Sequence, residues 1–195
     1  MNAQSSSVIQ VEDLRADSEP LRLAVVTETY PPEVNGVAMT LAQLVGGLQA
    51  RGHHIQLIRP RQASTDEADS GERFHEVLMR GVKIPNYPNL RMGVPSKRHL
   101  VRLWSTRRPD VVHIATEGPL GWSALQASRY LKLPVTSDFR TNFHAYSRHY
   151  GIGWLKKPIM AYLRKFHNAT QRTFVPTEAL RVDLESCRFQ SLRVI

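Results

Sequence analysis

The chain has 195 residues, 42% of them hydrophobic, which suffices for one full core of the size that single domains commonly reach. Its longest apolar stretches fall far short of the ~20 residues that cross a bilayer, and no signal-peptide pattern opens the chain, so we expect a cytoplasmic protein. The single cysteine, Cys187, excludes an internal disulfide and a cysteine-based zinc site, which fits a reducing compartment.

The formal net charge of +9 is distributed unevenly. Residues 1–20 form an acidic, polar and aperiodic stretch that we expect to be a flexible tail. Residues 79–109 contain eight Lys or Arg and no acid, and residues 139–177 form a second acid-free run. Such blocks favour an anionic partner, namely a phosphate-bearing ligand, an anionic membrane surface or nucleic acid, and a solvated basic face explains them equally well.

The pattern of regular elements begins at Leu21. Residues 21–28 are continuously apolar and β-branched, as in a strand buried on both faces. A helix follows, because apolar residues recur at helical spacing and Gly52 stands where a C-terminal cap belongs; the apolar residues are Val37, Met39, Leu41, Leu44, Val45 and Leu48.

The alternation of strands and helices continues to the end of the chain. We expect strands at 53–60, within 74–85, and at 109–115, 133–139, 172–176 and 192–195, with a polar surface loop at 62–73. We expect helices at 96–108, 120–131 and 177–187, and one that carries Ile159, Leu163, Phe166 and Thr170 on one side. This order predicts an α/β fold, a Rossmann-like parallel sheet with helices on both faces, wound right-handed.

Ligands of open parallel sheets bind at the carboxyl ends of the strands, so the connections that follow the strands are candidate sites. After the first strand come Tyr30, Asn35 and Gly36. The glycine would let an oxygen-rich ligand approach the backbone, and the start of a helix favours phosphate or sugar oxygens. Alternatively Asn35 and Gly36 only turn the chain, since neither a dinucleotide fingerprint nor a P-loop is present.

Two further connections carry polar groups. His113 lies within a strand and is interpreted as a buried histidine that hydrogen-bonds to the backbone. Glu117 follows the carboxyl end of that strand, where it could contact a polar substrate or the start of a helix. The stretch "FRTNFHAYSRHYG" follows another strand and gathers more hydrogen-bonding side chains than a plain surface loop needs. Its candidate binding and catalytic residues are Arg140, Thr141, Asn142 and His144.

The predicted helix around residue 160 carries a basic face. Lys156, Lys157, Arg164, Lys165 and Arg172 would gather opposite the apolar side of that helix. An ordinary amphipathic helix on the sheet explains this pattern, and contact of the basic face with anionic lipid is the alternative. No GxSxG nucleophile elbow is present, so a hydrolase triad has no support.

Four stretches together resemble the N-terminal domain of glycosyltransferase family 4, the retaining GT-B enzymes, especially bacterial α-mannosyltransferases and enzymes that act on diglyceride acceptors. They are "RLAVVTETYPPEVNGVAMTLAQLVGGLQARGHHIQLIRP", "PDVVHIATEGPLGWSAL", "TSDFRTNFHAYSRHYG" and "FVPTEAL". The resemblance runs from about Leu21 to Ile195 and implies that residues 21–195 form the acceptor-side domain of such an enzyme.

The resemblance also implies roles for single residues. The family's glycine after the first strand, which approaches the donor diphosphate or the acceptor, corresponds to Gly36. Many members carry a histidine near the transferred sugar where this chain has Arg140, and arginine cannot act as a base at neutral pH, although it can bind diphosphate or hydroxyl oxygens. His144, four residues later, is the alternative.

The resemblance implies a second, donor-binding domain that the sequence lacks, so the chain would be a fragment, a truncated frame or a half that needs a partner in cis or in trans. The expected reaction moves a hexose from a GDP- or UDP-linked sugar to a lipid or glycan acceptor, without metal or other cofactor, at the inner face of the plasma membrane. The rival hypothesis is a non-catalytic binding module whose basic face holds an anionic membrane or another polyanion; nucleic acid ranks low because no recognised motif accompanies the charge.

Overall fold

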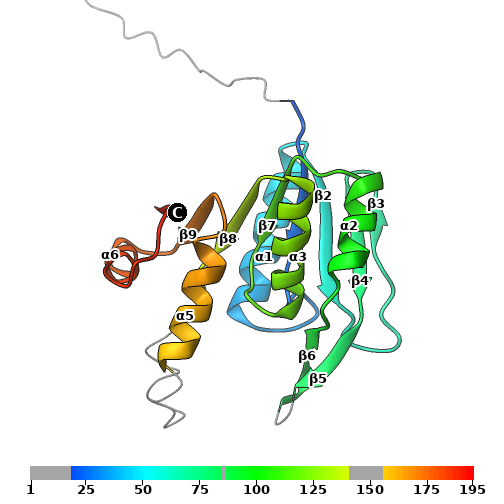
Figure 1. Ribbon diagram of the computed structural model, residues 1–195. Helices are drawn as coiled ribbons and strands as arrows, with labels where there is room; N and C mark the ends of the chain where they lie inside the picture. The colour runs from blue at the N-terminus through cyan, green and yellow to red at the C-terminus, as the bar shows by residue number, and fades with distance from the viewer. Residues whose placement is uncertain (1–18, 85–86, 141–155) are drawn as a thin grey trace, which may run out of the picture.

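An eight-stranded sheet organises the protein in the computed structural model, which describes residues 19–84, 87–140 and 156–195 (Figure 1). The strands across the sheet are β10 (Leu192–Val194), β9 (Arg172–Val175), β8 (Val135–Asp138), β7 (Val111–Ile114), β1 (Arg22–Val26), β2 (His54–Pro60), β4 (Phe74–Met79) and β3 (Ser70–Gly71). Every pair is parallel except β3 with β4. The Rossmann-like fold predicted from the sequence is therefore confirmed.

Helices cover both faces of this sheet. They are α1 (Gly36–Ala50), α2 (Lys97–Thr106), α3 (Pro119–Leu131), α5 (Lys156–His167) and α6 (Glu178–Ser186). Alternation along β1 sends Val26 into the core under α2 and α3, where it meets the buried Trp104, and sends Val25 into a second core with Val45 of α1. A third cluster joins Leu163, Val175, Leu184 and Phe189 near α5 and α6.

Helix α1 shows how local sequence sets the element nearest the candidate site. The side chain of Asn35 accepts a hydrogen bond from the N–H of Ala38 at 2.9 Å and so caps the first turn. At the other end Gly52 takes a φ of +87°, which favours glycine and confirms its predicted place after the last turn. The predicted apolar stripe is too wide, because Met39 is 51% exposed.

Three sequence predictions need correction. The loop at 62–73 contains the short antiparallel strand β3. The hairpin of β5 (Gly81–Ile84) and β6 (Tyr87–Gly93) extends away from the sheet, and β6 was not predicted because its sequence lacks alternation and contains Pro88 (Figure 1). Helix α5 ends at His167, so Thr170 and Arg172 lie beyond it and Arg172 belongs to β9.

The strand order reverses next to β1. From β1 the chain runs outward through β2 and β4, and then returns to place β7, β8, β9 and β10 on the other side. At such a switch point the connections leave in opposite directions and open a crevice at the carboxyl ends of the strands. The candidate site lies there.

Candidate functional site

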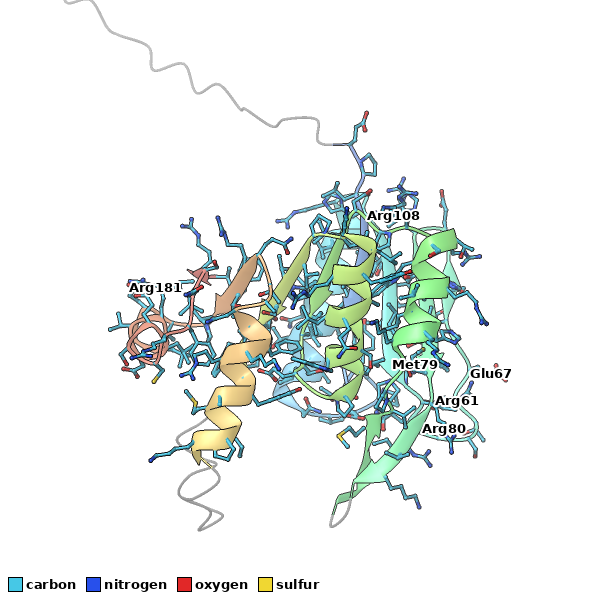
Figure 2. All side chains as sticks on the ribbon, viewed as in Figure 1. Arg61, Glu67, Met79, Arg80, Arg108 and Arg181 are labelled. Atoms are coloured by element: carbon cyan, nitrogen blue, oxygen red, sulfur yellow. The ribbon has the colours of Figure 1, made fainter. Side chains whose placement is uncertain are left out.

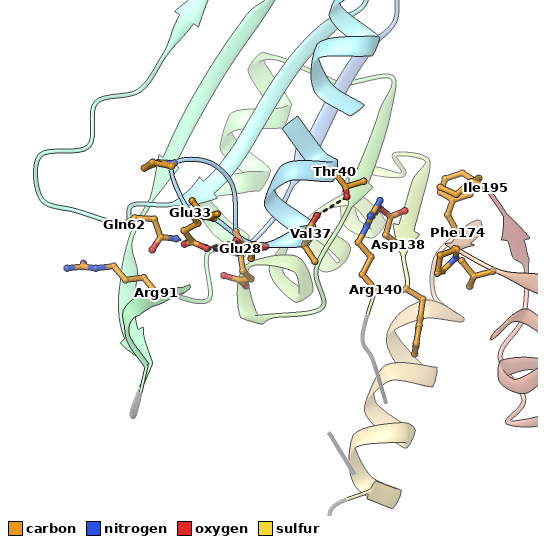
Figure 3. Close-up of a pocket in the computed structure, with 18 residues that line it drawn as sticks. Glu28, Glu33, Val37, Thr40, Gln62, Arg91, Asp138, Arg140, Phe174 and Ile195 are labelled. Carbon is orange, nitrogen blue, oxygen red and sulfur yellow. Dashed lines mark hydrogen bonds and ion pairs between the residues drawn. The ribbon is translucent and has the colours of Figure 1, made fainter. Parts of the chain in front are cut away.

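An open pocket of about 1420 Å³ lies at the carboxyl edge of the sheet. In the close-up of Figure 3, Gln62, Glu33 and Arg91 lie at one end, Asp138, Arg140 and Phe174 at the other, and Glu28 and Val37 between them. These residues follow β1, β2 and β8 or lie on β6, β8, β9 and α1, so the topology brings together segments far apart in the sequence. Asn35 and Gly36 also line this pocket, and their role toward a ligand stays a prediction.

The loop from β1 to α1 is held by a small polar network. Thr29 Oγ1 donates to Glu33 Oε2, and Asn35 Nδ2 donates to Thr29 Oγ1 at 2.7 Å. Asn35 therefore caps α1 with one end of its amide and anchors the loop with the other. These contacts give Asn35 a structural role in addition to its place in the pocket lining. A Cβ placed on Gly36 would meet no atom within 4 Å, so the backbone at Gly36 is open to a ligand.

Glu28 is a pocket residue that sequence reasoning missed. Its carboxylate accepts the N–H of Gly93 at 2.5 Å and the N–H of Leu120 at 2.9 Å, and so ties the hairpin to the first turn of α3. Burial raises the pKa of Glu28, and these backbone hydrogen bonds only partly oppose that rise. The carboxylate occupies the N-terminus of α3, whereas the first residues of α1, Gly36 and Val37, line the pocket. An acid at the end of an otherwise apolar strand segment was the available signal.

Asp138 and Arg140 form the other end of the pocket. Asp138 is 2% exposed, and its Oδ2 lies 2.6 Å from Arg140 Nη2 and 3.4 Å from His113 Nε2. Burial alone would raise the pKa of Asp138, but the hydrogen bonds and charges of His113 and Arg140 together hold it below the ordinary value. His113 also contacts Thr136 Oγ1 through Nδ1 at 3.0 Å, so its partners are side chains and not the backbone as predicted.

Two predicted binding residues lie outside the lining of this pocket. Tyr30 lines a separate cavity, which also contains the buried ion pair of Arg59 and Glu76. Glu117 points to α5, where its Oε1 lies 3.2 Å from His167 Nε2, and its carbonyl accepts the hydroxyl of Tyr162. Burial, with the charges of Glu117 and Glu28, raises the pKa of Tyr162 to about 12.

Several predicted residues are not described. Thr141, Asn142 and His144 lie outside the described residues, as does the predicted tail up to residue 18, and the side chain of Lys156 is likewise outside them. These assignments stay predictions. Of the remaining cations on α5, Lys157 is exposed.

Arg164 and Lys165 contact different neighbours. Arg164 Nη1 donates to the carbonyl of Cys187 at 3.2 Å, beyond the end of α6. Lys165 Nζ lies 5.8 Å from the ring centroid of Trp122 on α3. The two side chains therefore diverge to either side of α5 instead of forming one free basic face.

No group of three or more His, Cys, Asp or Glu placed to hold a metal ion occurs within the described ranges. In the same part of the chain, no helix is long and apolar enough to cross a membrane.

Comparison with known proteins identifies relatives of this arrangement. The profile of Glycosyltransferase Family 4 matches residues 34–195. A GDP-mannose-dependent alpha-mannosyltransferase of Mycolicibacterium smegmatis is 31% identical over 172 residues, which are 86% of this chain and 45% of that protein. An alpha-monoglucosyldiacylglycerol synthase of Streptococcus pneumoniae is 26% identical over 83% of this chain and 36% of its own length. The chain thus spans less than half of either relative.

Solved structures share the fold at low identity. Sucrose-phosphate synthase from Thermosynechococcus elongatus superposes with a TM-score of 0.62 at 10% identity, over 90% of this chain and 47% of that one. A glycosyltransferase from Rickettsia africae gives 0.55 at 13% identity, over 91% and 43% of the two chains. At these identities the likeness concerns the fold.

Proposed function

This chain belongs to glycosyltransferase family 4, and from that premise we propose that it is the acceptor-side domain of a retaining glycosyltransferase. The enzyme would move a hexose from a GDP- or UDP-linked sugar to a lipid or glycan acceptor, without a metal ion. The names of the relatives support both substrates, since one depends on GDP-mannose and another makes a glucosyldiacylglycerol. The observation that carries the proposal is the large pocket at the switch point of the sheet, whose lining includes Glu33, Asp138 and Arg140.

A second domain, in cis or in trans, belongs to this proposal as the donor-binding part. The relatives extend well beyond the matched region, which supports that division. The pocket described here would then form the acceptor wall of a cleft between two domains. Arg140 and Arg91 are the cations that line this wall.

Sugar transfer breaks the bond between the anomeric carbon and the diphosphate oxygen and forms a bond from that carbon to an acceptor hydroxyl oxygen. The main catalytic need is to stabilise the charge that grows on the departing diphosphate. The first N–H groups of α1 have no partner within the helix, and together with Arg140 they supply positive potential at the pocket. We retain Arg140 as the catalytic candidate on this wall, with His144 as the alternative.

The test is release of nucleoside diphosphate from a panel of sugar nucleotides, with membrane lipid extract as the acceptor source. We would compare this chain with a longer chain that carries a donor-binding domain, and Arg140→Ala with Arg129→Ala, a matched exposed arginine on α3. We expect turnover in the longer protein and a loss of at least about tenfold for Arg140→Ala alone. A folded longer protein that is silent across the panel would refute the proposal.

A specific surface favours the second candidate function, binding to an anionic membrane. Lys97, Arg98 and Arg102 are exposed on α2, and the ion pairs found in the described part of the chain involve none of them. Arg80 and Arg108 are also exposed and lie near opposite ends of α2 (Figure 2). Lys97 Nζ also lies 5.8 Å from the ring centroid of Tyr130 on α3. Binding through this surface would place the protein peripherally at the inner membrane face.

Flotation with vesicles tests this surface. Lys97→Glu with Arg102→Glu should abolish salt-sensitive binding to vesicles that contain phosphatidylglycerol, whereas Lys157→Glu should not. Binding that persists in the α2 double variant would exclude this surface. Salt-sensitive binding by a chain that shows no response to sugar nucleotides, even in the longer form, would favour the non-catalytic module over the transferase.

A further inference from the structure

Unpartnered acceptor oxygens gather around the pocket. In the part of the chain that the structure describes, five buried side-chain nitrogen or oxygen atoms lack a hydrogen-bond partner. Three of the five are oxygens of residues that line this one pocket: Glu33 Oε1, Gln62 Oε1 and Asp138 Oδ1. The concentration of such atoms in one place is informative, because buried polar groups are nearly always paired.

These three oxygens require hydrogen-bond donors. A carboxylate oxygen only accepts, and the Gln62 amide is oriented by its Nε2, which donates to the carbonyl of Glu28 at 3.4 Å, so its oxygen is the free end. Leaving a buried acceptor unpaired costs free energy, because the group has lost its hydrogen bonds to water. A ligand that brings hydroxyl donors recovers that cost, and Glu33 and Gln62, which are only partly buried, can turn their outer atoms toward it.

The charge of the pocket disfavours an anionic ligand at the same place. Glu28, Glu33 and Asp138 face Arg91 and Arg140, so acids outnumber cations here although the whole chain carries +9. Arg140 is in addition held by Asp138 at 2.6 Å, which offsets its charge. At the end formed by Glu33 and Gln62 the unpartnered atoms are acceptors, and a phosphate offers almost no donors at neutral pH.

We propose that this pocket binds a neutral, hydroxyl-rich group, the sugar ring or polyol head of the acceptor, through Glu33 and Gln62 at one end and Asp138 at the other. This proposal rests on the proposed function and deepens it. It separates an acceptor with several hydroxyl groups from a diacylglycerol, which offers one. The donor diphosphate then binds beyond these acceptor oxygens, where Arg140 and the start of α1 approach it and the donor-binding domain supplies further cations.

The test measures binding to this chain itself. Binding would be measured by ligand-observed NMR with methyl α-mannopyranoside, myo-inositol, dioctanoylglycerol and pyrophosphate. In separate spectra of the protein, the side-chain amide signal of Gln62 would be followed with each compound. We expect the two polyols to bind with dissociation constants on the order of millimolar and to shift that amide. We expect no such shift with dioctanoylglycerol or pyrophosphate.

Two variants and a control sharpen the test. Glu33→Gln keeps an oxygen for Thr29 and Asn35 but replaces the spare acceptor by a donor, and Gln62→Met removes the amide. Each should weaken polyol binding about three- to tenfold, since each removes about one hydrogen bond. Glu67→Gln, the same exchange at an exposed residue outside this pocket, should change nothing.

The outcomes separate this proposal from the proposed function. No polyol binding, or binding that both variants retain, overturns the inference even if a longer enzyme turns over sugar nucleotides. Displacement of the polyol by GDP-mannose would assign the hydroxyl-rich site to the transferred hexose and overturn the acceptor assignment. Polyol binding as expected, together with an inactive longer enzyme, would refute the transferase proposal while supporting a sugar-binding role for the pocket.

Discussion

Arg140 and Asp138 form an ion pair in which two guanidinium nitrogens, Nε and Nη2, lie 2.7 and 2.6 Å from the same carboxylate oxygen. His113 approaches that oxygen at 3.4 Å from the neighbouring strand β7. Because the Asp138 side chain is buried, this arrangement fixes the guanidinium at the pocket wall before any ligand arrives. The position of Arg140 therefore depends on two residues that the sequence placed in strands.

Removing His113 should raise the pKa of Asp138. In the native protein that pKa lies below the ordinary value, so ionised Asp138 stabilises the fold above the unfolded carboxyl pKa, and this contribution is lost as pH falls through the folded pKa. In His113→Phe only Arg140 opposes the effect of burial on the pKa of Asp138, so acid unfolding should begin at a higher pH. Carbon NMR of the carboxyl groups and urea unfolding between about pH 3 and 6 measure both effects. His99→Phe, at an exposed site, is the control.

Replacing Glu28 should weaken the connection between the hairpin and α3. In Glu28→Gln an amide N–H₂ must face a backbone N–H of Gly93 or Leu120, so we expect a loss of about 1–3 kcal/mol at neutral pH. Burial raises the pKa of Glu28, so above the folded-state pKa the ionised carboxylate lowers the free energy of unfolding. The native protein therefore becomes more stable as pH falls through that folded-state pKa. The variant should lack this gain. Urea unfolding at about pH 7 and pH 5 tests both points, and equal pH slopes would contradict them.

Substitution by alanine should change the stability of the protein little at Gly36 and strongly at Gly121. A Cβ at Gly36 meets nothing within 4 Å, so Gly36→Ala should alter the free energy of unfolding by less than about 1 kcal/mol while hindering a ligand that approaches the backbone. A Cβ at Gly121 would collide with the backbone carbonyl of Thr116 and lie 3.0 Å from Ile114 Cγ2. Gly121→Ala should therefore destabilise by roughly 3 kcal/mol. Thermal unfolding separates the two, and unchanged sugar-nucleotide turnover in Gly36→Ala would remove Gly36 from the site.

Tyr30→Phe should leave substrate turnover within about twofold of the native value, because an exposed or remote change that keeps the ring rarely alters a distant site. Tyr30 lines the cavity beside Arg59 and Glu76, and not the main pocket. Kinetics on the longer protein check this, with Glu33→Gln as the comparison. A tenfold loss in Tyr30→Phe would return Tyr30 to the substrate site.

The sequence by itself determined the alternation of strands and helices and the left-handed turn at Gly52, because these follow from local periodicity and backbone preference. It also indicated Gly36 and Arg140 as residues at the carboxyl edge of the sheet. Only the tertiary structure decided that Glu28, Gln62 and Arg91 line the same pocket as Gly36 and Arg140. The sequence of β6, which carries Arg91, has no periodic signal, and the end of β6 at Gly93 is held by the Glu28 carboxylate 65 residues away. The tertiary structure also decided which oxygens have no partner, because hydrogen bonding between distant segments depends on how the strands pair and not on local pattern.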